Sequence, residues 1–426
     1  MVRWRKGWTG LVLAIGCVSL GMATAAERGQ SAAEWADVLN LGSTFSVYSY
    51  GQAPYNRSAP FLKIEERVRF SAGAAAFTNP LARSIESVSG VVSTASANAP
   101  SCESCHFRDG RGRTHSADFG ATGFSVVNRG RDSPPVFRRP ADSDAGAFRL
   151  GDVRWVFADR IILSGGESVE LVRPVALVDG VERAVDLRNA PGVYGLGLLE
   201  SIPDADIVAS AQARPYEGFG VTGLVPLARS ADAPVRVGHF GWKGTFATLS
   251  EQVRSAVVTE LGIGLEDPEL AALVTTLTNY LRLLAVPARR LNGEGTYHRG
   301  AQLFALTGCA MCHVPSQRTG QTADLPEPYQ SLSIFPFTDM LLHDMGPGLS
   351  DPSASELSRH WRTAPLWGIG VQHGVSREAG FLHDGRARTF TEAILWHGGE
   401  ARYAVNRFKT LTPEDRADLI AFLASL

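Results

Sequence analysis

Two Cys-x-x-Cys-His segments, at residues 102–106 and 309–313, constrain this chain more than any other feature of its sequence. This pattern is the attachment signature of c-type haem. Two thiols separated by two residues reach the same porphyrin edge, and the histidine that follows gives an imidazole nitrogen to the iron. The sequence therefore predicts two covalently bound haems c. The predicted thioether residues are Cys102, Cys105, Cys309 and Cys312, and the predicted proximal ligands are His106 and His313.

The cysteine count favours haem over the competing interpretations, a zinc site or disulfide chemistry. The chain has five cysteines, and the fifth, Cys17, lies in an N-terminal apolar segment. A zinc site needs four ligands in one place, whereas Cys102 and Cys309 are 207 positions apart. Disulfides would not explain why a histidine directly follows each cysteine pair.

The first 26 residues have the pattern of a secretory signal. Three basic residues within the first six precede an apolar stretch at 11–23, and Ala-x-Ala at 23–25 offers a cleavage site. Thirteen residues are few for a membrane span. We therefore expect export to the periplasm, removal of residues 1–26 and no membrane span in the mature chain.

The charge balance argues against a nucleic-acid partner. Removing the three basic residues of the signal from 41 leaves 38 basic against 43 acidic residues, a net charge of −5. A nucleic-acid-binding surface would need a basic stripe, which this sequence lacks.

The two motifs divide the mature chain into two predicted haem domains, 27–288 and 289–426. Between them, leucines at helical spacing after Asp267 and Pro268 predict a helix that ends at Pro287. Further helices are expected near 300–306 and from Thr412 onward. Residues 153–188, with β-branched runs broken by glycines, predict short strands within an insertion at about 115–235.

Several segments, most of them in the C-terminal part, resemble those of a known protein family. They lie at 308–315, 342–346, 361–368 and 381–389, and weaker matches lie at 195–200 and 240–243. Together they resemble the di-haem oxidoreductase family, whose members are labelled peroxidases or thiol oxidoreductases. That family is similar to the bacterial di-haem cytochrome c peroxidases.

The resemblance implies a mostly α fold with two cytochrome c-like haem domains, the first carrying an inserted loop and short-strand segment. It also implies a peroxidatic first haem and an electron-accepting second haem, with a calcium ion between the domains. The electron donor would be a small c-type cytochrome or a cupredoxin.

Three site residues follow from the resemblance by position. Trp242 precedes Gln252 by ten residues, as the inter-haem tryptophan of the superfamily does, and would relay electrons between the haems. Gln252 and Glu260 would face the open side of the first haem. A carboxylate there suits the proton transfer that peroxide cleavage requires. Glu251 is the alternative to Glu260.

The sixth ligand of the second haem stays open at this point. Leu382 replaces a methionine that ligates that haem in many peroxidases. Met345 is the predicted substitute, and Met340, His343, His373 and His383 compete with it. His115, nine residues after His106, is a weak candidate for a distal ligand of the first haem.

These residues predict an oxidoreductase that reduces hydrogen peroxide with electrons passed from the C-terminal to the N-terminal haem. Two alternatives remain. A high-valent di-haem state could oxidise a partner protein, as in the methylamine-utilisation di-haem enzyme, or the chain could be a plain electron-transfer cytochrome. A thiol oxidase role has no support, because no cysteine is left to exchange disulfides.

Overall fold

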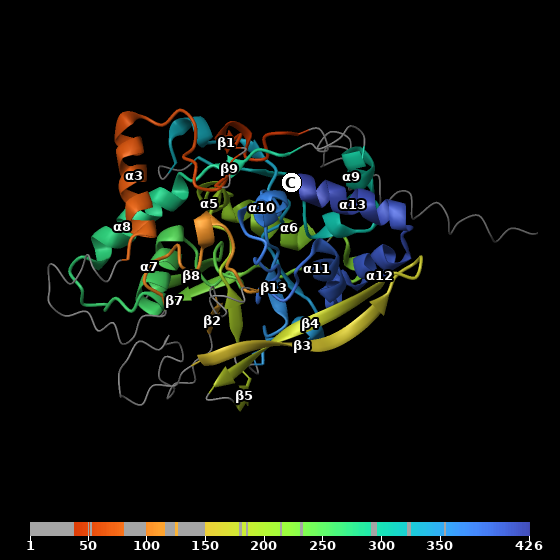
Figure 1. The fold of residues 1–426 in the computed structure, drawn as a ribbon. Coiled ribbons are helices and arrows are strands. Elements are labelled where there is room, and N and C mark those ends of the chain that lie inside the picture. Colours follow the sequence, from red (N-terminus) through yellow and green to blue (C-terminus); the bar gives the residue numbers. More distant parts are fainter. Residues whose placement is uncertain are drawn as a thin grey trace, which may run out of the picture.

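The structure, a computed structural model (Figure 1), covers most of the chain beyond the predicted signal. It describes residues 38–426 except 50, 52, 81–98, 116–123, 127–149, 179–180, 185, 214, 231–232, 291–295, 322–324 and 353–354. The predicted signal segment, 1–26, therefore lies outside the described residues. No helix within the described ranges has both the length and the apolar character needed to cross a bilayer.

Helices and sheets share the described part of the chain. The structure is 39% helical and 17% strand. The α-helices are α3 (Ile64–Thr78), α5 (Leu196–Glu200), α6 (Asp204–Ala213), α7 (Leu249–Glu260), α8 (Leu270–Arg282), α9 (Thr296–Leu306), α10 (Gln372–Val375), α11 (Phe390–Trp396), α12 (Arg402–Thr410) and α13 (Pro413–Ser425).

The strands form several small sheets. They are β1 (Ser46–Val47), β2 (Phe124–Val126), β3 (Leu150–Ile162), β4 (Ser168–Val178), β5 (Val181–Arg183), β6 (Leu187–Asn189), β7 (Leu227–Ser230), β8 (Ala233–Val237), β9 (Val286–Pro287), β10 (Gln317–Arg318), β11 (Ser333–Ile334), β12 (Leu342–Asp344) and β13 (His360–Arg362). Apart from the three-stranded sheet β3-β4-β5, the sheets described have two strands. The prediction of a mostly α fold made of cytochrome c-like domains is therefore wrong.

The longest strands lie where short strands were predicted. β3 and β4 pair antiparallel from Leu150↔Val178 to Ile162↔Ser168. Gly165 and Gly166, with φ of 90° and 85°, make the turn, a conformation that glycine adopts without steric cost. The β-branched runs were recognised, but a local pattern cannot reveal that two of them pair along their whole length.

The hairpin extends from the first part of the chain onto the last helices. At its turn, the carbonyl of Ser164 accepts a hydrogen bond from Arg416 Nη2 at 2.8 Å, and Glu167 pairs with the same guanidinium at 3.1 Å. Figure 1 shows β3 and β4 running beneath α11 and α12. The predicted insertion thus packs against the C-terminal region.

Two helix pairs flank the motifs, one for each (Figure 1). α3 packs on α8 near the first motif, and α9 packs on α13 beside the second. Each crossing has a glycine at its closest approach. A Cβ on Gly73 would lie 2.4 Å from Tyr280 Cβ, and one on Gly300 would lie 2.1 Å from the Asp418 carbonyl oxygen. Only glycine lets the backbones approach this closely.

The helix predictions hold in part. α13 begins as expected, because Thr412 Oγ1 accepts a hydrogen bond from Asp415 N at 3.1 Å and Pro413 takes the first helical position. α8 ends at Arg282, earlier than the predicted Pro287. The residues after it turn into β9, which pairs in parallel with β1.

The two predicted domains share one buried apolar cluster. It contains residues from both sides of position 288, including Leu198 and Trp367. These two regions approach closely, since a Cβ on Gly195 would lie 2.7 Å from the Trp367 ring. The boundary at 288/289 stays a prediction.

Candidate functional site

The second motif lies directly after α9, in a tight turn. Gly308, with φ of 94°, ends the helical path, and a 3-10 turn (Cys309–Met311) follows. The His313 N–H then donates to the Cys309 carbonyl at 3.0 Å. This winding brings both sulfurs and the imidazole to one side of the turn.

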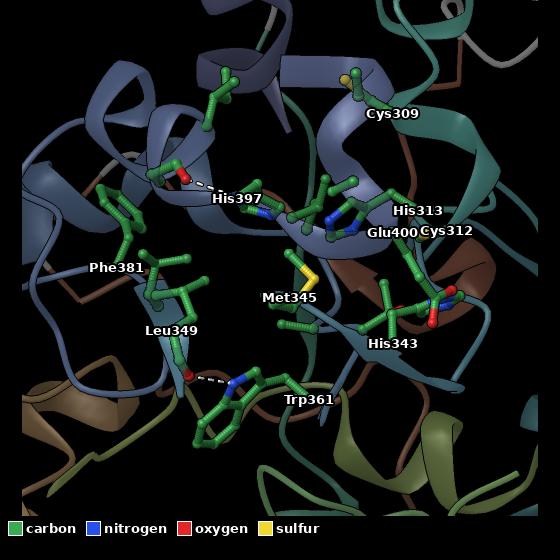
Figure 2. Close-up of a pocket in the computed structure, with 18 of the residues that line it drawn as sticks. Cys309, Cys312, His313, His343, Met345, Leu349, Trp361, Phe381, His397 and Glu400 are labelled. Atoms are coloured by element: carbon green, nitrogen blue, oxygen red, sulfur yellow. Dashed lines mark hydrogen bonds and ion pairs between the residues drawn. The ribbon is translucent and has the colours of Figure 1, made fainter. Parts of the chain in front are cut away.

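That side faces a cavity with about 1430 Å³ of empty space, counting the part open to solvent. Its walls are mostly apolar and come from residues far apart in the sequence. Those that carry chemistry are Arg111, Trp242, Cys309, Cys312, His313, His343, Met345, Trp361, Arg362, Leu382, His383, His397 and Glu400. Figure 2 shows several of them around the open space.

The His313 ring is fixed in the orientation that an iron ligand needs. Its Nδ1 lies 3.0 Å from the Phe337 carbonyl oxygen, and no described residue hydrogen-bonds Nε2. Burial, and then the neighbouring His397 imidazole, lower the pKa of His313 to about 4, so the ring is neutral at physiological pH. A neutral imidazole held through its far nitrogen is the usual form of a metal-ligating histidine. Two thiols, this imidazole and the apolar walls fit a haem.

His343 cannot supply a ligand to that haem, because both of its nitrogens are occupied. Nε2 lies 2.9 Å from Asp339 Oδ2, and Nδ1 lies 2.7 Å from Glu400 Oε2. Burial alone would lower the pKa of His343, but the two carboxylates raise it well above its usual value. The ring is therefore an imidazolium at neutral pH.

The same residues explain a cluster that could otherwise suggest a metal ion. Cys312, Asp339 and His343 hold possible ligand atoms within 4.8 Å of one another. If Cys312 forms a thioether, the cluster has no thiolate to bind a metal. The Cys312 sulfur would also be a poor ligand for calcium, which prefers oxygen ligands. The predicted calcium ion therefore gains no support from this cluster and stays a prediction.

Of the other predicted ligands of the second haem, some line the cavity and others do not. Met345 lines the cavity, as predicted, whereas Met340 is fully buried with its sulfur 3.6 Å from Arg362 Nη1. His383 lines the cavity but stacks on Trp361 at 3.6 Å, with Nε2 3.7 Å from an Asp384 oxygen. His373 is absent from the lining.

His397 is a cavity residue that the sequence analysis missed. It follows α11, and its Nδ1 lies 2.6 Å from the Ala393 carbonyl oxygen. A signal was present, because four residues at helical spacing line the cavity together: Phe390, Ala393, Ile394 and His397.

The first motif holds its histidine in the same way as the second. His106 Nδ1 lies 2.7 Å from the Pro191 carbonyl oxygen, and burial lowers the pKa of the ring. The Glu103 N–H donates to the Phe77 carbonyl at 3.2 Å, which ties the motif to the end of α3. Close by, the Tyr280 hydroxyl donates to Asp109 at 2.8 Å.

His115 has its Nε2 committed elsewhere. This atom lies 2.8 Å from the Gly385 carbonyl oxygen, and the ring stacks on Trp155 at 4.2 Å. It is therefore poorly placed to act as the distal ligand that the sequence suggested as a weak candidate.

Trp242 lies between the surroundings of the two motifs. Its ring lines the cavity of the second motif, and its Nε1 donates to the Asn189 carbonyl at 2.9 Å. Asn189 is two residues before Pro191, whose carbonyl fixes His106. The indole thus spans from the second cavity to the end of β6, two residues before the carbonyl that fixes the first histidine.

Arg111 is a second connection, and the sequence analysis missed it. It follows His106 by five residues, lines the second cavity and places its guanidinium carbon 5.4 Å from the Trp242 ring centroid. It donates to the Gly380 and Leu382 carbonyls at 2.8 and 2.7 Å. Burial lowers its pKa to about 10, so it stays charged at neutral pH.

Trp361 is another cavity indole, in a different electrostatic setting. Lys243 Nζ lies 3.6 Å from its ring centroid, and the Arg188 guanidinium lies 4.8 Å from it. Its Nε1 donates to the Leu349 carbonyl at 2.8 Å (Figure 2).

The predicted acid–base residues lie on α7. The Glu260 carbonyl accepts a hydrogen bond from Ala99 N at 3.1 Å, three residues before Cys102, so the end of α7 adjoins the first motif. Gln252 Oε1 is buried and receives no hydrogen bond from the described residues. Glu251, the alternative, caps α7 with Thr248 and pairs with Arg236, which gives it a structural role.

Comparison with known proteins adds a family for the C-terminal part. Residues 265–426 match the model of the family described as "Di-haem oxidoreductase, putative peroxidase", which confirms the resemblance over that range. No curated protein matches the chain. A solved structure of Kuenenia stuttgartiensis hydrazine synthase, pressurised with 20 bar xenon, is similar at 14% identity and a TM-score of 0.39, covering 100% of this chain and 98% of that one. A likeness at this level carries no conclusion about this chain.

Proposed function

We propose that this protein is an exported di-haem c-type cytochrome oxidoreductase that reduces hydrogen peroxide. The observation that carries the proposal is the position of Trp242. Its ring lines the second cavity, and its Nε1 bonds the strand that leads to the carbonyl fixing His106. The match of residues 265–426 to a di-haem oxidoreductase family supports the same reading.

In this proposal the two motifs hold two haems, which supply one-electron redox chemistry when bound. The thioethers form at Cys102, Cys105, Cys309 and Cys312, and His106 and His313 are the proximal ligands. Electrons enter at the C-terminal site from a small c-type cytochrome or a cupredoxin and leave at the N-terminal site. This assignment implies that the protein works in the periplasm after cleavage of residues 1–26.

Trp242 is the proposed route between the sites. An indole can pass single electrons through a transient radical. Trp242 is the better relay by position. Its Nε1 donates to the Asn189 carbonyl, two residues before Pro191, whose carbonyl fixes His106, whereas the Trp361 Nε1 donates to the Leu349 carbonyl.

Glu260 and Gln252 are the proposed acid–base pair at the first site. Peroxide reduction consumes two electrons and two protons and releases two waters. A carboxylate beside the first motif would suit the proton transfer between the two peroxide oxygens that this reaction requires. The end of α7 adjoins Ala99, close to Cys102, which supports this role for Glu260.

The test is to add peroxide to the reduced, fully haem-loaded protein and to follow its oxidation. We expect oxidation much faster than free haem gives. Trp242→Phe should slow electron transfer between the haems by about tenfold or more, equal to about 1.4 kcal/mol on the barrier. Trp361→Phe is the matched control and should leave the rate near that of the wild type. Equal effects of both changes, or oxidation no faster than with free haem, would contradict the proposal.

One observation favours a second function, oxidation of a partner protein. Leu382 stands where many peroxidases have a methionine ligand, and it lines the second cavity. Its carbonyl accepts a hydrogen bond from Arg111, so the position connects both halves of the site. Oxidised tryptophan or tyrosine in a co-purified protein, formed with peroxide but without an added donor, would support this function over peroxide reduction.

A further inference from the structure

We infer that His397 is the second axial ligand of the haem held by the C-terminal motif, together with His313. The inference rests on the proposed presence of a haem at that motif. It assigns the sixth ligand to a residue that neither the motif nor the resemblance identified.

The first support is the way in which the His397 ring is held. Its Nδ1 lies 2.6 Å from the Ala393 carbonyl oxygen, and no described residue hydrogen-bonds its Nε2. The same arrangement fixes His313 through Phe337 and His106 through Pro191. A histidine whose Nδ1–H is committed to a carbonyl presents Nε2 to a metal in the correct tautomer.

The second support is position. His313 and His397 both line the cavity, and Figure 2 shows the two rings facing the same open space. Both rings thus border the space in which a haem attached to Cys309 and Cys312 would lie.

The third support is the state of the other histidines. All ten of the chain lie in described residues, and four line the cavity: His313, His343, His383 and His397. Two carboxylates occupy His343, and His383 lies flat against Trp361 with its Nε2 toward Asp384. His397 is therefore the cavity imidazole left to pair with His313.

Met345 is the remaining competitor. It lines the cavity beside His397 (Figure 2), but none of the contacts described for it fixes its thioether. A methionine side chain has three rotatable bonds, so holding it at a metal costs more conformational entropy than holding an anchored imidazole. Two histidines also predict a lower reduction potential for this haem than a histidine and a methionine would give.

The experiment compares His397→Gly with Met345→Leu, each as the oxidised, fully haem-loaded protein, by electron paramagnetic resonance and near-infrared absorption. In His397→Gly we expect one low-spin signal to be lost and a high-spin signal to replace it. In Met345→Leu we expect the low-spin signal to be unchanged. The wild type should lack the sulfur-to-iron charge-transfer band that methionine ligation produces. Loss of the low-spin signal in Met345→Leu, or its retention in His397→Gly, would overturn the inference.

Imidazole rescue separates loss of a ligand from misfolding. Added imidazole should return the second haem of His397→Gly to low spin, because it fills the space left by the side chain. Wild-type protein with imidazole is the reference, since an open first haem also binds it. Failure of rescue with both haems attached would count against ligation. The number of attached haems, measured by mass, tests the proposed function separately. A second motif without haem would contradict the proposed function itself, and not only the assignment of His397 as a ligand.

Discussion

The two motifs use the same proximal arrangement but differ in what faces it. His106 and His313 each place Nδ1 near a backbone carbonyl oxygen, and each motif adjoins a helix pair that crosses at a glycine. Around the second motif the chain adds a cavity, an anchored second imidazole and a buried imidazolium network. Around the first, the described residues offer a tyrosine–aspartate pair and no histidine free to ligate.

This difference suggests how one type of motif can serve two purposes. A haem closed by two protein ligands exchanges electrons with little rearrangement, whereas a haem with an open position can bind a small oxidant. In the proposed function, one additional histidine, His397, is enough to make the second site a relay and to leave the first site for chemistry.

The largest effect should come from removing one haem at a time. We expect Cys102→Ser/Cys105→Ser to reduce peroxide turnover to the level of free haem and to abolish the spectral response to cyanide. We expect Cys309→Ser/Cys312→Ser to lose donor-driven turnover but to keep the cyanide response. Electron paramagnetic resonance with and without cyanide measures this, and the reverse pattern would exchange the roles of the two sites.

The next effect concerns stability and contrasts the charged network of the second site with the pair at the first. His343→Asn leaves Asp339 and Glu400 buried without their cation, so we expect a loss of about 3–5 kcal/mol in the free energy of unfolding. Tyr280→Phe removes one hydrogen bond to Asp109 and should cost less, about 1–3 kcal/mol. Chemical denaturation of the two haem-loaded variants checks the order, and equal losses would mean that the networks are equivalent.

Replacing the glycine at either helix crossing should lower the stability by a similar amount, and by less than His343→Asn does. Gly300→Ala would place a methyl group 2.1 Å from the Asp418 carbonyl oxygen, and Gly73→Ala would place one 2.4 Å from Tyr280 Cβ. Forcing helices apart typically costs about 1–3 kcal/mol. Gly374→Ala is the control, because no atom of the described residues, apart from its chain neighbours and the backbone of α10, lies within 4 Å of the added Cβ. Thermal unfolding should separate the first two variants from the third.

The sequence was most informative where chemistry is local. The five adjacent residues of a Cys-x-x-Cys-His segment supply both thioether cysteines and the iron ligand. The start of α13 at Thr412 and Pro413 likewise depends only on neighbouring residues. Trp242, predicted only through a resemblance, does lie between the surroundings of the two motifs, although its role is untested.

What the sequence could not predict depends on residues that meet only after folding. His343 appeared to be a ligand candidate until Asp339 and Glu400, the latter 57 residues away, were seen to occupy both of its nitrogens. Nothing in the sequence singled out Arg111, yet its guanidinium extends from the neighbourhood of the first motif to the carbonyl of Leu382. The mostly α prediction failed for the same reason, because helical periodicity is visible locally and strand pairing is not.

A pH-dependent effect should appear on acidification and belongs to the second site. Burial alone would raise the pKa of Glu400, but His343 and the backbone N–H groups of Thr222 and Asp344 lower it to about 2. A carboxylate with a lowered folded-state pKa stabilises the fold above its unfolded value, near pH 4.5, and this contribution disappears as the pH falls through 2. We therefore expect Glu400→Gln to be less stable than the wild type at pH 5, with the gap narrowing progressively toward pH 2. Unfolding midpoints of both proteins across this range test the prediction, and a constant gap would mean that Glu400 contributes through packing rather than charge.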